Sequence, residues 1–162
     1  MSMPNPKRTA VRVQKVRLYP DVEMKQVLDE LCDYRRYCWN EALALWNDMY
    51  EQSLILDDRK SRPSEYKVRN ELVAEKQDWQ YALSARVLQL SVSDLNKAFR
   101  NFFDKAQTDW GKPKFKSKKA PRQGFKTDRA RIVNGKLLLD RPHESRHKKK
   151  WTAIPFKGAK SL

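Results

Sequence analysis

The residues GKPKFKSKKAPRQGFKT, Gly111 to Thr127, mark the point where the chain changes character. The stretch holds six lysines and one arginine, no acidic residue, and two interleaved phenylalanines, Phe115 and Phe125. Like charges at this density repel one another, whereas a phosphate backbone attracts them because each bound cation releases counterions. The phenylalanines suit either base stacking or anchoring of short strands. We therefore expect a nucleic-acid-binding segment, with a merely solvated basic loop as the alternative.

The distribution of charge supports a polyanionic partner. The chain has 162 residues and a formal net charge of +15. Residues 111–162 contain 17 basic and 3 acidic residues, which gives +14, whereas residues 1–110 contain 18 and 17, which gives +1. Such asymmetry predicts binding to a nucleic acid through the last third of the chain. A membrane surface is the weaker alternative, because prolines interrupt the segment and prevent an amphipathic helix.

The sequence contains no apolar run long enough to cross a bilayer and no signal-peptide core. It has only two cysteines, Cys32 and Cys38, so a disulfide framework is not expected. We expect a cytoplasmic, nucleoid-associated prokaryotic protein with no membrane partner.

Residues 1–110 are mainly helical in pattern. A strand with a bulge is predicted at Val11–Tyr19, where apolar and polar residues alternate. Three amphipathic helices follow, each preceded by a capping residue. We place them at Asp21–Ser53, Ser64–Lys76 with Val73 facing inward, and Ser84–Gln107.

After Trp110 the period changes to that of short strands. The residues Ile132–Leu137, IVNGKL, form a strong hairpin signal because Asn-Gly fits a type I′ turn. A last strand is predicted at Trp151–Phe156. Strands separated by a helical block can share one sheet, so the fold class is α+β.

Enzymatic motifs are weak. His143–His147 spells H-E-x-x-H, but Pro142 and a lysine run flank it and no apolar helical stripe surrounds it. The two cysteines are six residues apart and point in different directions on a helix. With four glycines the chain is poor material for a nucleotide-binding loop. We expect no catalytic residues and no metal ligands, since the acids of the basic third lie in turn-like or basic settings, at Asp128, Asp140 and Glu144.

Four stretches in order resemble the TnpB family, the RNA-guided nucleases of insertion-sequence transposons, whose members are also called OrfB-type transposases. They are RLYP at Arg17–Pro20, YRRYCWNEAL at Tyr34–Leu43, LNKAFRNFF at Leu95–Phe103, and KPKFKSKKAPRQGFKT followed by IVNGKLLL between Lys112 and Leu139.

The resemblance implies an architecture and a function. In the family a small antiparallel wedge β-barrel is interrupted by a helical recognition domain. Here that implies a first wedge strand in residues 1–20, a three-helix recognition bundle in residues 21–110, and the remaining barrel with its basic loop in residues 111–162. The family lobe grips guide RNA and target DNA and reads a short motif beside the target, while base pairing reads the rest.

The resemblance also suggests individual binding residues. Gln89 falls where the family has a motif-reading glutamine on its third helix, and Tyr66 falls near a reader on the second helix if a gap is allowed. Thr127 to Arg129 fall in a loop that also reads the motif. Together with the basic residues of the lysine-rich stretch, the expected nucleic-acid-binding set is Tyr66, Arg86, Gln89, Lys112, Lys114, Lys116, Lys118, Lys119, Arg122, Lys126, Thr127 and Arg129.

The catalytic part of the family has no counterpart in these 162 residues. The family's RuvC-like nuclease domain and its zinc ribbon, with their Mg²⁺ and Zn²⁺, would follow Leu162, and RPHESRHKKK replaces the short link expected after the hairpin. We therefore expect a truncated or split protein that needs no cofactor and does not cut DNA alone, with the missing nuclease half as a possible partner. The alternatives are a standalone DNA- or RNA-binding regulator and a ribosome-type RNA-binding protein.

Overall fold

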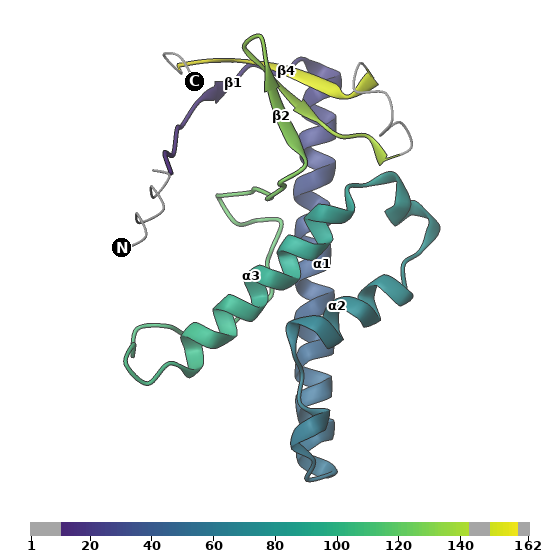
Figure 1. The fold of residues 1–162 in the computed structure, drawn as a ribbon, viewed down its shortest axis with the longest axis vertical. Coiled ribbons are helices and arrows are strands. Elements are labelled where there is room, and N and C mark those ends of the chain that lie inside the picture. Colours follow the sequence, from purple (N-terminus) through teal and green to yellow (C-terminus); the bar gives the residue numbers. More distant parts are fainter. Residues whose placement is uncertain (1–10, 143–149, 159–162) are drawn as a thin grey trace, which may run out of the picture.

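The structure, a computed structural model, describes residues 11–142 and 150–158. In these residues three α-helices lie between a short first strand and three later strands (Figure 1). The predicted H-E-x-x-H motif at His143–His147 lies outside the described residues. The α+β class and the order of elements are confirmed.

Helix α1, Val22–Ile55, is the spine of the molecule (Figure 1). It begins where predicted, because the Met24 amide donates to Asp21 Oδ1 at 2.8 Å and so satisfies one free amide of the first turn. It runs 34 residues without a break.

The other helices, α2 at Glu65–Ala74 and α3 at Ala85–Phe103, pack on α1. Two 3₁₀ turns, η1 at Arg59–Ser61 and η2 at Asp78–Ala82, join them. Ser64 caps α2 as predicted, accepting the Lys67 amide. Two expectations were wrong: Val73 is 44% exposed, and α3 ends at Phe103 instead of Gln107. Asp104 adopts an extended conformation there, and its Oδ1 accepts the Ala106 amide, which starts a turn.

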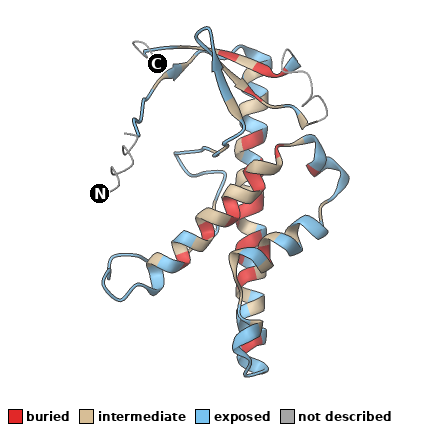
Figure 2. Ribbon diagram, viewed as in Figure 1, coloured by how far each residue is buried: buried red, intermediate tan, exposed pale blue. Residues whose placement is uncertain are grey.

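One core joins the helices to the sheet. Its fully buried members come from all three helices and from the last strand, as the red segments of Figure 2 show: Ala42, Val68, Val92, Leu95 and Ile154. The ring of Trp46 on α1 stacks on that of Phe99 on α3, with centroids 4.7 Å apart. Burying such aromatic surface is the largest single source of stability available to a domain of this size.

The sheet has the antiparallel order β1-β4-β3-β2, formed by Arg17–Leu18, Thr152–Lys157, Lys136–Leu139 and Ala130–Val133. The predicted hairpin is confirmed, because Asn134 and Gly135 both have positive φ, 50° and 72°, as a type I′ turn requires. The first and last strands pair, with Leu18 opposite Phe156.

Two predictions about the sheet were wrong. The four described strands form an open sheet and not a closed barrel. The first strand does not extend over Val11–Tyr19 and has no bulge, and Val11 and Val13 are 91% and 94% exposed. Arg17 pairs with Lys157, the last residue of β4, so among the described residues no strand lies opposite those before Arg17.

Candidate nucleic-acid interface

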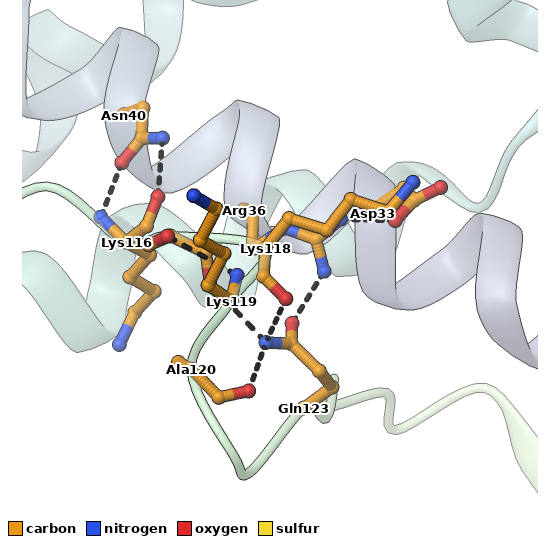
Figure 3. A network of polar contacts seen from close by, with 9 residues as sticks. Asp33, Arg36, Asn40, Lys116, Lys118, Lys119, Ala120 and Gln123 are labelled. Atoms are coloured by element: carbon orange, nitrogen blue, oxygen red, sulfur yellow. Dashed lines mark hydrogen bonds and ion pairs between the residues drawn. The ribbon is translucent and has the colours of Figure 1, made fainter.

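The lysine-rich stretch is held along helix α1 by side chains of that helix (Figure 3). Asn40 uses both ends of its amide: Nδ2 donates to the Lys116 carbonyl at 3.0 Å, and Oδ1 accepts the Lys116 amide at 2.8 Å. From the preceding position of α1, Trp39 Nε1 donates to the Lys114 carbonyl at 2.8 Å. These bonds satisfy backbone groups of a segment that has no strand partner, so they fix its path across the helix.

A second anchor closes the loop that follows. Gln123 Nε2 donates to the carbonyls of Ala120 and Ser117, at 2.9 and 3.2 Å, and its Oε1 accepts from Arg36 of α1. Arg36 is itself oriented by an ion pair with Asp33. The loop is therefore tied at both ends to one surface of α1, and its exposed side chains project from a fixed backbone (Figure 3).

Part of the positive charge is neutralised inside the molecule. Lys126 Nζ lies 3.0 Å from Asp94, which also receives Arg35 at 3.6 Å. Lys116 Nζ lies 4.3 Å from the centre of the Trp39 ring. Burial, together with the charge of Arg35, lowers the pKa of Lys116. Lys116 is therefore a poor candidate for contact with phosphate, whereas Lys126 stays 61% exposed and its charge is balanced by Asp94 at the surface.

The remaining cations of the stretch are exposed. Within the described residues their side chains make no hydrogen bond, ion pair or ring contact: Lys112, Lys114, Lys118, Lys119 and Arg122. Five unpaired cations on one anchored loop form an electrostatic surface for a phosphate backbone. We call this set the free cations.

A separate cluster joins α3 to the loop before β2. Arg86 donates two hydrogen bonds to Asp128, from Nε to Oδ1 at 2.6 Å and from Nη2 to Oδ2 at 2.5 Å. Its Nη1 donates a third hydrogen bond to Gln89 Oε1. These hydrogen bonds raise the pKa of Arg86 and lower the pKa of Asp128. The cluster brings the expected reader Gln89 beside the expected reading loop, where Thr127 Oγ1 accepts the Arg129 amide at 3.1 Å.

The remaining expected residues lie apart from that cluster. Tyr66 is 65% exposed on α2, under the guanidinium of Arg69 at 5.8 Å. Its neighbour Glu65 contacts Asn96 of α3 at 3.4 Å, and Asn96 is seven residues, or about two turns, from Gln89. Arg129 pairs with Asp140, at 3.8 Å, near the sheet.

Sequence reasoning missed the residues that hold the stretch in place, namely Arg36, Asn40 and Gln123. One signal was available: Asn40 follows Trp39, among residues expected to form helix contacts. A polar amide in such a position must find hydrogen-bond partners.

No group of three or more His, Cys, Asp or Glu side chains able to hold a metal ion occurs in residues 11–142 and 150–158. Within the same residues, no helix is both long enough and apolar enough to cross a membrane.

Comparison with known proteins finds a similarity to a class of transposon proteins in the N-terminal part of the chain. Residues 11–54 match the family HTH_OrfB_IS605, described as a helix-turn-helix domain. Over these residues the chain is similar to the N-terminal part of IS605 transposon proteins of the OrfB/TnpB type, and the matched span includes the RLYP and YRRYCWNEAL motifs. A domain of this class indicates DNA binding. No curated protein matches the chain.

The matched residues do not themselves form two helices joined by a turn. In the structure they contain β1 and nearly all of the unbroken helix α1. The matched residues therefore contain no second helix that could enter a groove of DNA. The side chains best placed for a nucleic acid lie on the stretch that α1 holds and on α3.

Proposed function

We propose that this chain is the nucleic-acid-gripping lobe of a TnpB-like transposon protein, holding guide RNA and target DNA beside a transposon-adjacent motif. The observation that carries the proposal is the anchoring of the lysine-rich stretch on α1, which presents the free cations from an ordered backbone. The residues present supply binding, and cutting is left to a nuclease domain outside them.

Physical chemistry favours such a surface over a flexible basic tail. A tail loses conformational entropy when it binds, which lowers its affinity. Here bonds from Trp39 and Asn40 have already restricted the backbone. Binding therefore orders only the lysine and arginine side chains, and more of the electrostatic attraction contributes to affinity.

Two kinds of contact with the nucleic acid have different roles. The free cations contact phosphates and set position, which carries no sequence information. Gln89, within α3, carries a side-chain amide that can make paired hydrogen bonds to the edge of an adenine in the major groove. Its Oε1 is engaged by Arg86, so pairing requires Arg86 to give up that bond while Asp128 continues to hold the guanidinium.

The test measures binding of an RNA hairpin and of a DNA duplex at several salt concentrations. If the five free cations each neutralise one phosphate, the logarithm of the binding constant falls with the logarithm of salt with a slope of about −4.5 on duplex DNA. Replacement of all five by glutamine should bring the slope close to zero. An affinity independent of salt in the unaltered protein would contradict the proposal.

The same samples test the division between binding and cutting. With Mg²⁺ and any guide, the DNA should remain intact, because the described residues bring no set of carboxylates together on a metal. Cleavage that disappears when one acid of this chain is replaced would show that the chain has a nuclease site.

A further inference from the structure

A groove of opposite charge runs along α1 beside the surface that holds the lysine-rich stretch, and Asp33 belongs to both through its ion pair with Arg36. Three hollows of about 580, 480 and 110 Å³ follow one another there. The first two share Glu30, Ala82 and Leu83, and the last two share Tyr37, so the three hollows adjoin one another. Together we call them the acidic groove. It lies between α1 and the connection from α2 to α3, and reaches the end of β3.

Six carboxylates stand along its partly apolar walls: Glu23, Glu30, Asp33, Glu41, Glu75 and Asp140. The one cation lining it among the described residues is Arg141, whose Nε donates to Thr152 Oγ1. Asp33 is paired with Arg36, and Asp140 has Arg129 at 3.8 Å. This concentration of acidic residues is opposite in sign to the net charge of the chain, which is +15.

The floor of the first hollow holds two buried polar groups without a short hydrogen bond, and the nearest cation, Arg129, lies 3.8 Å from Asp140 Oδ2. Ser84 Oγ and Asp140 Oδ2 have no hydrogen bond within the described residues, and each side chain is 3% exposed. Burial raises the pKa of Asp140, and the charge of Arg129 lowers it only in part. A buried carboxylate oxygen without a donor is costly, and an incoming ammonium or guanidinium group would supply the missing hydrogen bonds.

Aromatic rings line the middle hollow. The edge contacts of Trp79 with Tyr34 and Tyr37 have centroid separations of 5.9 and 5.0 Å. Trp79 remains 45% exposed, with Glu30 and Asp33 beside it. Rings attract a cation over their faces, and the neighbouring carboxylates strengthen that attraction. The hollow thus suits a basic side chain with an aliphatic stem, which packs on the rings.

We infer that the acidic groove binds an arginine- or lysine-rich extended segment of a partner protein. The length favours a peptide over a small cation. Glu23 and Glu41 are 18 residues apart on α1, about 27 Å along the helix. An extended peptide of about nine residues covers that distance at about 3.3 Å per residue. Its alternate side chains reach the successive carboxylates, whereas a lone cation occupies one hollow.

This inference does not rest on nucleic-acid binding, because none of the free cations lines the acidic groove. The probe is a fluorescein-labelled peptide of about nine residues with alternating arginine and alanine. Fluorescence anisotropy should show saturable binding to the full chain. A matched peptide with glutamine in place of arginine should not bind. Equal binding of both peptides would overturn the inference.

Variants locate the bound peptide. Glu30→Gln should weaken binding about fivefold and Trp79→Ala about tenfold, since each removes one partly desolvated attraction. Asp29→Asn is the matched control: it removes the same charge from the next position of α1, and Asp29 lines none of the three hollows. Its affinity should stay within about twofold of the unaltered protein. Equal weakening by Asp29→Asn and Glu30→Gln would show that only general charge is sensed.

Two further measurements complete the test. Circular dichroism and thermal melting check that each variant folds. If Trp79→Ala does not fold, Glu30→Gln still tests the inference, because Glu30 is exposed and its replacement leaves the core unchanged. A form with residues 143–149 replaced by glycine and serine asks whether that basic segment competes. Peptide binding that requires this replacement would show that the occupant is the chain itself, which would overturn binding of a partner protein.

Discussion

The two sides of helix α1 differ in everything except the helix they share. On one side Trp39 and Asn40 hold a backbone crowded with lysines. On the other, Glu30 and Tyr34 line the acidic groove. Nine residues separate Glu30 from Trp39, and at about 100° per residue this places them on opposite sides of the helix. A single amphipathic element therefore separates two surfaces of opposite sign.

The net charge of the whole chain therefore describes neither of the two surfaces of α1. The lysine-rich stretch keeps its charge available because its backbone, not its side chains, makes most of the bonds to α1. The acidic groove keeps its charge because aromatic rings and short 3₁₀ segments, which carry few cations, form its opposite wall. In both cases the neighbouring element decides whether a charge is free or paired.

The largest expected effect comes from the tryptophans on the two sides. Trp39→Ala should lower the free energy of unfolding by about 3–5 kcal/mol, because the ring is 7% exposed in the core and its loss leaves a cavity. It also removes the bond to Lys114. Urea unfolding monitored by circular dichroism measures the change.

The matched control is Trp79→Ala on the groove side. That ring is 45% exposed and contributes mainly its edge contacts with Tyr34 and Tyr37, so the expected loss is about 1–2 kcal/mol. If both replacements cost the same, the two sides of α1 do not differ in structural role as argued.

Local signals made much of this architecture predictable. The starts of α1 and α2 followed from Asp21 and Ser64, because a capping side chain acts on amides three residues away. The hairpin followed from Asn134-Gly135 for the same reason of locality. The first strand was overestimated because its length depends on Lys157, about 140 residues later, where its partner strand ends.

The interface was less predictable than the fold. The sequence marks a lysine run, but the division between paired and free cations depends on Asp94 and Asp128, which only the folded chain brings near. The acidic groove was not foreseen, since its carboxylates belong to α1, α2 and the sheet and are scattered along the sequence. The pattern of charges along one helix does not reveal which side chains of the neighbouring elements lie opposite it.

A smaller effect is expected from the proposed reader. Gln89→Ala should relax the preference at one base pair by about 1–3 kcal/mol and leave the salt dependence unchanged, because the residue is neutral and reads a base edge. Binding to a panel of duplexes with single substitutions measures it. Asn96→Ala is the control, since Asn96 follows two turns later on α3 and contacts Glu65 instead. Equal weakening on every duplex by Gln89→Ala would remove the reading role.

The smallest effect tests whether pairing within the fold decides which lysines bind phosphate. Lys118 is a free cation, whereas Lys126 is paired with Asp94 at 3.0 Å in the same stretch. Lys118→Ala should therefore reduce the salt slope by about one and weaken all duplexes alike. Lys126→Ala removes the same formal charge, but its ammonium group is already compensated, so the slope should change by much less. Titrations at four or more salt concentrations with one duplex separate the two variants. If they lose equal slope, the ion pair with Asp94 opens when nucleic acid binds, and the distinction between paired and free cations does not hold in the complex.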